Sequence, residues 1–584
     1  NPQLRILRRM SLSRLRRVVD TAIEEMVITA AQAPAILAVR ATHLAICDNR
    51  VVMSDERSSW PAIFVSGSLI HVERNIVTLA STATIVRFLP DTVANEINLK
   101  LPDPKGDVRH PGGIQIGGPS ANVYVLCNEI AGGSRNGVTL GSLIAVDANQ
   151  NPTGGWIGVI VENGDNCCTG GLTVTGGGTT SGGGTTYINA GPLTNINIEE
   201  NIISSMGLCG IGPVAYFDFV TQFEVISIEG LSITGNTITD TVKRAIDNSK
   251  ATALTALMGI GAITVPDVSS LVIRDNAITN FGENPGVQVS GIFILLCEGL
   301  EIARNRIFET RDWTQASTEN ANAHMVSGGI IVMFATPPTA AAATLAYSNP
   351  IHEPGVPAVR IAENTVRVAL GQGLVLIGTG PTAIVNNHFA TGGAIAASSF
   401  QLAQTVCILN LGKPIELSAA ASSNPSSMVE GIQSGNFNGQ VAGAADFSGV
   451  SNGTVLFTNN TCQLEARESG QSEMASVFVY TADSLIFSNN ATWLDAARLS
   501  AWIDVLLLAF TVQVTGNRLQ EPVGSVLLSG FTIGAFNITV HNISTACLLA
   551  LPANAVKDGN IVLLDAAGGE KCTRVFGSLA VAKT

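Results

Sequence analysis

The stretch LSITGNTI, residues 231–238, decides the fold of this chain, and LVIRDNAI at residues 271–278 repeats it. Both copies share one order: apolar, any residue, apolar, two further residues, asparagine, any residue, apolar. The positions before the asparagine alternate with a period of two, which is typical of a β-strand and not of a helix. The pattern therefore predicts a strand that runs into an asparagine corner.

The same pattern recurs through most of the sequence, in eleven copies. The last copy has His541 at the asparagine position, and the other ten are centred on Asn128, Asn201, Asn236, Asn276, Asn305, Asn364, Asn387, Asn460, Asn490 and Asn517. The shortest spacing, from Asn364 to Asn387, is 23 residues. A unit of that length is too short for a four-stranded propeller blade but suits one coil of a solenoid.

A second strand follows each asparagine motif and is repeatedly opened by glycine. Examples are GIGPV at residues 210–214, GIFI at residues 291–294 and GLVL at residues 373–376. Glycine suits a tight corner because it has no Cβ. Each coil thus reads as strand, asparagine corner, loop, glycine corner and strand.

This combination resembles the right-handed parallel β-helix repeat of the pectin-lyase-like superfamily, over about residues 112–550. The architecture is also similar to that of tail spikes. In that superfamily the corner asparagines stack as an internal ladder, so the resemblance implies a structural role for the ten asparagines named above. The fold expected is an all-β, right-handed parallel β-helix of about eleven or more coils. A side-chain amide carries both donors and acceptors and can satisfy a turn in this way.

Composition excludes several classes of protein. The chain has 584 residues, of which 46% are hydrophobic and only 13% charged, which argues against disorder. Its 59 glycines argue against a coiled coil, and no apolar run reaches the length that a transmembrane helix needs. The net charge of −13 supplies no basic stripe for nucleic acid.

The first part of the chain precedes the eleven copies. Six arginines between Arg5 and Arg17 lead into residues 21–31, which we interpret as a basic helix that sits on an acidic or membrane surface, or packs against a subunit. The sequence thus predicts a helical or mixed N-terminal capping and docking region over residues 1–111. The β-helix is expected over residues 112–550, and a C-terminal cap or tail over residues 551–584.

Two catalytic β-helix families carry residue signatures with which the repeat can be compared. Polygalacturonase-like enzymes carry Asn-Thr-Asp, Asp-Asp, Gly-His-Gly and Arg-Ile-Lys motifs, and the sequence has none of them. Pectate-lyase-like enzymes carry acidic calcium ligands beside a basic residue. The charged residues that come nearest to this pattern are Arg274, Asp275, Glu301, Arg304, Arg306, Glu309 and Asp312. Arg304, Glu309 and Asp312 are the catalytic candidates, and Trp313 is the candidate for a carbohydrate contact.

A structural interpretation of these charges competes with the catalytic one. Asp275, Arg304 and Glu363 occupy the position directly before the asparagine in three successive copies. Stacked coils would turn them into a ladder of alternating charge on the solvent side. The ladder is the favoured interpretation.

Metal and cofactor sites find no support in the sequence. The ten cysteines form no CxxC pair, and the seven histidines do not cluster with them. Most cysteines lie in apolar strand patterns and are expected to be small buried thiols. We therefore expect no metal and no cofactor.

Two functions are consistent with these features. The favoured one is a non-catalytic structural or ligand-binding β-helix, for a carbohydrate or a surface receptor, in a surface appendage or phage-tail-like assembly. The alternative is a lyase or glycoside hydrolase acting on an acidic polysaccharide, which rests on fold-level analogy alone. Expected partners are other subunits of the assembly, further copies of this chain, and a polysaccharide. An extracellular or surface location is favoured.

Overall fold

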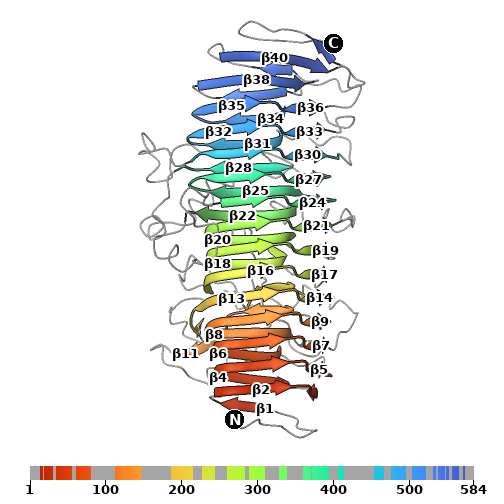
Figure 1. The fold of residues 1–584 in the computed structure, drawn as a ribbon, viewed down its shortest axis with the longest axis vertical. Coiled ribbons are helices and arrows are strands. Elements are labelled where there is room, and N and C mark those ends of the chain that lie inside the picture. Colours follow the sequence, from red (N-terminus) through yellow and green to blue (C-terminus); the bar gives the residue numbers. More distant parts are fainter. Residues whose placement is uncertain are drawn as a thin grey trace, which may run out of the picture. The chain divides into compact units, whose positions relative to one another are not determined.

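Every element in the described part of a computed structural model of this chain is a β-strand (Figure 1). The described residues are 13–16, 19–30, 34–54, 61–79, 112–133, 135–146, 186–214, 226–243, 259–282, 289–309, 328–337, 359–369, 371–392, 405–412, 453–465, 475–494, 503–520, 530–534, 537–545, 548–550, 556–564 and 570–572. The chain divides into two compact units, Asn1–Leu296 and Cys297–Thr584.

In the first unit, each coil has a strand that runs into a corner and a shorter strand that leaves it. The strands before the corner are β2 (Val19–Glu24), β4 (Ile36–Cys47), β6 (Pro61–Glu73), β8 (Gly112–Leu126), β13 (Leu193–Glu199), β16 (Ser227–Thr234) and β18 (Ile260–Arg274). The strands after it are β3 (Val27–Ala30), β5 (Arg50–Met53), β7 (Ile76–Leu79), β9 (Glu129–Ala131), β14 (Ile202–Ser204), β17 (Thr237–Thr241) and β19 (Ala277–Phe281). A third set contains β1 (Ser13–Arg16), β10 (Val138–Leu140) and β15 (Ile211–Pro213), and β11 (Leu143–Val146) pairs antiparallel with β12 (Thr186–Asn189).

The second unit repeats this plan, and β20 (Val289–Ala303) contains the boundary between the units. The strands before the corner are β23 (Val359–Ala362), β26 (Thr382–Val385), β29 (Val455–Thr458), β32 (Ser484–Ser488), β35 (Thr511–Thr515), β38 (Asn537–Thr545) and β40 (Val556–Leu564). Those after it are β21 (Arg306–Glu309), β24 (Thr365–Val368), β27 (His388–Thr391), β30 (Thr461–Leu464), β33 (Ala491–Leu494) and β36 (Arg518–Gln520). The third set is β22 (Gly328–Thr336), β25 (Gln372–Gly378), β28 (Val406–Asn410), β31 (Ala475–Thr481), β34 (Ile503–Leu508), β37 (Gly530–Gly534) and β39 (Leu548–Ala550), and β41 (Glu570–Cys572) pairs antiparallel with β40.

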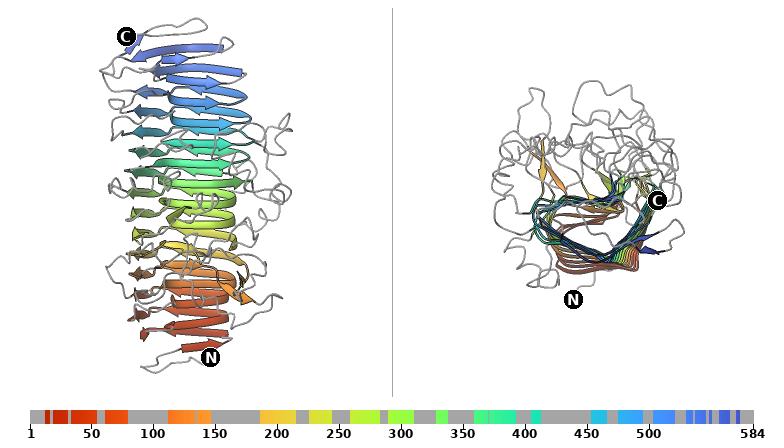
Figure 2. Two further views of the ribbon diagram at one scale, coloured as in Figure 1. Left: turned by 180° about the vertical axis from the view of Figure 1, so that it is seen from behind. Right: turned by 90° about the horizontal axis from the view of Figure 1, so that it is seen from above.

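Successive coils pair in parallel and in register, so like side chains stack on like. Ile198 pairs with Val125 of the preceding coil and with Ile233 of the next, and all three are fully buried. In the second unit, Phe457 and Phe487 are register partners whose rings stack 5.2 Å apart. Figure 2 shows this layering of strands within each unit from two further directions. The arrangement is all-β and parallel and is compatible with a β-helix.

The asparagines form a continuous hydrogen-bonded ladder through most of the first unit. The Oδ1 atom of Asn201 accepts from the backbone N and the Nδ2 of Asn128, both at 2.9 Å. The Nδ2 of Asn201 donates to the carbonyl of Val125 at 2.8 Å and to Oδ1 of Asn236 at 3.0 Å. In the second unit the same bonds join Asn305, Asn364, Asn387, Asn460, Asn490 and Asn517. The stacking of asparagine side chains expected from the sequence is confirmed.

The helical cap expected at the N-terminus is wrong. Residues 21–31, expected to be helical, contain most of β2 and all of β3, and β2 pairs in parallel with β4. The physical reason is the pattern of burial, since exposed and buried side chains alternate along Val27–Ala30 with the period of a strand. Arg14 and Arg16 lie in β1, whereas Arg5, Arg8, Arg9 and Arg17 lie outside the described residues. A docking role for residues 1–111 and a capping role for residues 551–584 stay predictions.

Two members of the ladder were missed by the sequence analysis although they carry its signal. LAICDNRV at residues 44–51 and IHVERNIV at residues 70–77 both match the repeat pattern. Asn49 donates its Nδ2 to the carbonyl of Ile23, and Asn75 donates to that of Ile46, each at 2.8 Å. In the coil before them Met26 stands at the ladder position, and its backbone N donates to Oδ1 of Asn49.

The residue before each ladder asparagine adopts the left-handed backbone conformation. The φ angles of Asp48, Arg74, Cys127 and Glu200 lie between 52° and 57°, and Gly235 has a φ of 68°. A residue with a Cβ meets steric cost in this conformation, of about 1–2 kcal/mol. The bonds that the following asparagine makes to backbone groups on two coils hold this bend in place.

The glycine expected at this corner is required because no side chain would fit there. A Cβ on Gly373 would lie 2.9 Å from the carbonyl oxygen of Thr405 and 3.0 Å from Cβ of Phe389. Both atoms belong to the wall of the next coil, so the backbone approaches its neighbour more closely than any other residue type would allow.

Replacing Asn201 by alanine is expected to lower the free energy of unfolding by about 3–5 kcal/mol. The change leaves the buried backbone N of Asn128 without its Oδ1 acceptor and removes one hydrogen bond each from Nδ2 of Asn128 and the carbonyl of Val125, and each such loss in a buried site costs about 1–3 kcal/mol. Asn197→Ala, on the outward side of the same strand, is the matched control and should cost under about 1 kcal/mol. Denaturant unfolding measures both, and equal losses would contradict the assigned role of the ladder.

Candidate functional site

The candidate residues Arg304 and Glu309 lie at opposite ends of β21 and in different surroundings. Arg304 is exposed at the corner before the strand, where its φ is 55°. Glu309 is the last residue of β21, and only 1% of its surface is exposed. A substrate in solution would reach the guanidinium but not this carboxylate. Asp312 and Trp313 lie outside the described residues, so their roles stay predictions.

The second acidic residue of this region, Glu301, is held in an ion pair within the second unit. Its Oε1 accepts from Nη1 of Arg360 at 2.8 Å, and the two residues are register partners on β20 and β23. The Glu301 side chain is 4% exposed and that of Arg360 35%. A carboxylate so enclosed depends on its partner, since removal of the arginine would leave a buried charge. This pair joins one coil to the next.

The three residues of the expected charge ladder all occupy the left-handed corner. Asp275, Arg304 and Glu363 have φ angles of 58°, 55° and 59°. Arg304 and Glu363 directly follow β20 and β23, whose residues 300–303 and 359–362 are register partners in the second unit. Asp275 occupies the same position in the first unit. Pairing of these charges into a ladder stays a prediction.

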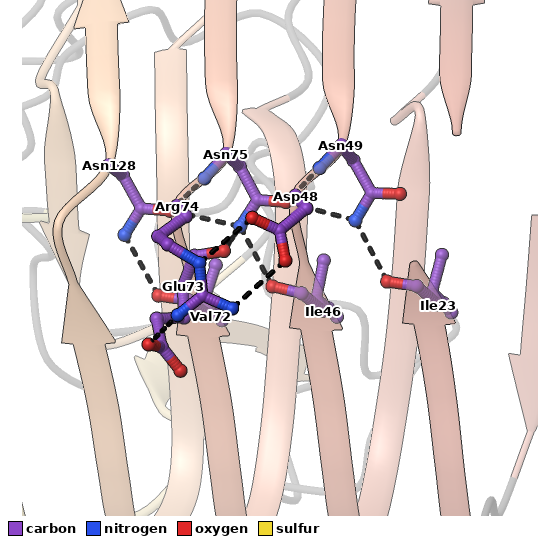
Figure 3. A network of polar contacts seen from close by, with 9 residues as sticks. All are labelled: Ile23, Ile46, Asp48, Asn49, Val72, Glu73, Arg74, Asn75 and Asn128. Atoms are coloured by element: carbon purple, nitrogen blue, oxygen red, sulfur yellow. Dashed lines mark hydrogen bonds and ion pairs between the residues drawn. The ribbon is translucent and has the colours of Figure 1, made fainter. Parts of the chain in front are cut away.

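A corner of the first unit shows how such charges pair along the stack (Figure 3). The Nε and Nη2 atoms of Arg74 donate to Oδ1 and Oδ2 of Asp48 at 2.8 and 2.9 Å, and Nη1 contacts Glu73. Behind them, Asn49, Asn75 and Asn128 point inward as ladder members. The hydrogen bond from Arg74 holds the pKa of the Asp48 carboxyl below its ordinary value.

Cys127 takes the same corner position one coil further on. It is exposed, and its Sγ donates a hydrogen bond of 3.5 Å to Oε2 of Glu200. Partial desolvation, followed by this bond and the negative charge of Glu200, raises the pKa of the thiol. Cys47, on β4, is buried, and burial together with the charges of Glu73 and Glu24 raises its pKa to about 11. Neither thiol is an activated nucleophile at neutral pH.

The remaining cysteines follow the sequence prediction where the structure describes them. Cys209, Cys297, Cys407 and Cys462 are all buried, and burial raises the pKa of Cys407 to about 12. Within the described ranges, no group of three or more His, Cys, Asp or Glu side chains could hold a metal ion. His388 is half-buried on β27, where burial, and then the charge of Arg367, lowers its pKa.

A search of protein-family models finds no match for this chain, and no curated protein matches its sequence. No helix in the described part of the chain is long and apolar enough to cross a membrane.

The Asp48 carboxyl is expected to titrate below its ordinary range, because Arg74 stabilises its charged form. In Arg74→Met the pKa should rise toward the ordinary value, as measured by the chemical shift of the ¹³C-labelled carboxyl carbon. Because the folded pKa is depressed, the stabilisation is present above the unfolded pKa and is lost as pH falls through the folded one. Arg50→Met, two residues beyond Asp48, is the control and should leave the titration unchanged.

Alkylation of Cys127 is expected to be faster in Glu200→Gln than in the wild-type protein near pH 8. The amide removes the negative charge that disfavours the thiolate, so the thiol pKa falls and the reactive fraction grows. Peptide-level mass spectrometry after iodoacetamide treatment measures the rate at this cysteine. Cys47 provides an internal control, since its alkylation should stay slow in both proteins. An unchanged rate at Cys127 would show that Glu200 does not control the thiol.

Proposed function

We propose that this chain is a right-handed parallel β-helix of the pectin-lyase-like architecture. We further propose that it serves as a non-catalytic structural or ligand-binding component of a surface appendage or phage-tail-like assembly. The observation that carries this proposal is that polar side chains form hydrogen bonds and ion pairs between successive coils. The asparagine ladder, Asp48 with Arg74, and Glu301 with Arg360 all join one coil to the next. Such bonds favour a stiff support for a binding surface.

The burial of the acidic candidates also favours a non-catalytic role over polysaccharide cleavage. Glycoside hydrolysis needs two carboxyl groups about 5–9 Å apart, with the substrate between them. Glu309 is buried, and Glu301 is enclosed and paired with Arg360, which leaves neither positioned to flank a sugar in solution. An extracellular or surface location would suit a component of this kind.

A carbohydrate or surface receptor is the ligand class that we propose. Trp313 was selected from the sequence for a sugar contact, and Trp493 on β33 is a further candidate, since 38% of its surface is exposed. Its register partner on β30 is Gln463, so the indole lies beside an amide side chain. Aromatic faces beside amide groups suit sugar rings, because apolar and hydrogen-bonding surfaces alternate on a sugar.

The proposal predicts binding without turnover on a panel of acidic and neutral polysaccharides. Assays for reducing ends and for unsaturated uronides should give no signal above background, while glycan binding should weaken at least about fivefold in Trp493→Ala or Trp313→Ala. Phe510→Ala, which removes another exposed aromatic side chain, is the binding control. Robust turnover that disappears in Arg304→Ala or Asp312→Ala would replace this proposal with the polysaccharide lyase or hydrolase.

A further inference from the structure

On five successive short strands of the first unit, one outward row of side chains alternates apolar and charged residues, and it continues on β17 and β19 with Thr237 and Ala277. The strands β3, β5, β7, β9 and β14 pair in this order, and Figure 1 shows the last four one above the other. Their first residues are direct register partners. These residues, called here the outer row, are Val27, Arg50, Ile76, Glu129 and Ile202.

The apolar members of the outer row are unusually exposed. Val27 is 76%, Ile76 45% and Ile202 53% exposed, and they are half of the large exposed hydrophobic residues found in the described part of the chain. Each is followed in its strand by a buried inward residue, such as Ile28 or Val77, so these strands pack against the core. Aligned on one face, these aliphatic side chains offer apolar area that a partner could bury.

The charged members of the outer row have no partner among the residues that the structure describes. Arg50 and Glu129 are exposed and take part in no side-chain hydrogen bond or ion pair among the described residues. They lie two strands apart, about 10 Å, with Ile76 between them. The nearby corner charge Arg74 is different, because Asp48 and Glu73 already neutralise it.

The order of the row makes it complementary to itself when it is reversed. It reads apolar, positive, apolar, negative, apolar, with Ile76 at the centre. We propose that the outer row is the contact surface of a homodimer in which two copies pack face to face with their stacking directions antiparallel. A two-fold axis at Ile76 sets Arg50 against Glu129 of the second copy, and Val27 against Ile202 of the second copy. Such self-complementarity is what an isologous interface requires.

The neighbouring outward row permits the same approach. It contains Thr29, Val52, Thr78, Ala131 and Ser204, which are uncharged and small or β-branched. No like charges therefore meet on this second row in the antiparallel dimer. With the stacking directions parallel, each Arg50 would instead lie over β5 of the second copy, close to its Arg50. The antiparallel arrangement is thus the one that pairs opposite charges.

The size of this surface predicts a weak dimer. Five strands at about 4.8 Å span about 19 Å, and the two rows together cover far less than the roughly 800 Å² per partner of a standard stable interface. Association should therefore depend on protein concentration. It should also weaken as salt rises from about 0.1 M to about 1 M, since the Debye length falls from about 10 Å to about 3 Å. This inference does not depend on the proposed function.

Charge reversal provides the test, with the full chain studied by sedimentation velocity over a concentration series. Arg50→Glu alone and Glu129→Arg alone should each raise the dissociation constant about tenfold, because two attractive pairs become repulsive. The double variant should recover wild-type association. An equimolar mixture of the two single variants should form a heterodimer, since every facing pair is then opposite in charge.

Two further variants complete the experiment. Ile76→Glu sets two carboxylates against each other on the axis and should abolish the dimer. Arg518→Glu reverses an exposed arginine at the same step of a coil in the second unit and should change nothing. Circular dichroism confirms that each variant is folded. A chain that stays monomeric up to about 1 mM, a dimer that Ile76→Glu leaves intact, or single variants that fail to associate when mixed would each overturn the proposal.

Discussion

The constraint on which the rest of the structure depends is the satisfaction of backbone groups at the corner of each coil. Parallel strands pair with the coils before and after them, but a chain that bends sharply leaves backbone groups without a ladder partner. The asparagine amide resolves this, because its oxygen accepts from the coil before while its nitrogen donates to the carbonyl of that coil and to the next asparagine. The bend turns one face of each strand inward, and in-register pairing then stacks the apolar core from coil to coil.

The ladder also explains which residues are tolerated beside it. The residue before each asparagine is left-handed in backbone conformation, yet in the first unit it includes Asp48, Arg74, Cys127 and Glu200. The intrinsic cost of this conformation is offset by the bonds of the asparagine, so the side chain at the corner is free to vary. Charges there pair along the stack, as Asp48 and Arg74 do, and the exposed corner contributes to surface chemistry more than to stability. Reactive chemistry is correspondingly scarce among the described residues, since the one exposed thiol, Cys127, has a raised pKa.

Much of the fold could be predicted from the sequence, but less of the candidate site. The period-two alternation and the asparagine of residues 231–238 recur at the ladder positions that the structure shows, and the same signal was present at Asn49 and Asn75. Both residues precede the stretch 112–550 over which the repeat was predicted, within the region 1–111 expected to be a helical or mixed cap. Local charge misled there because β2 and β3 gain their stability from pairing with β4 and β5, which is a tertiary effect that overrides local propensity. For the site, the sequence indicated Glu309 as a catalytic candidate, but only the structure shows that its side chain is buried.

The sequence by itself determined the strand period, the asparagine corners and the close approach at glycine, because each depends on the chemistry of a few consecutive residues. Only the tertiary structure decided which side chains meet across coils. Arg50 and Glu129 are far apart in the chain, yet they stand on either side of Ile76 because register pairing brings β5, β7 and β9 together. The loops between coils differ widely in length, so sequence separation carries no information about such neighbours. Hydrogen bonding between parallel strands fixes them instead, and with them the surface that a second molecule would meet.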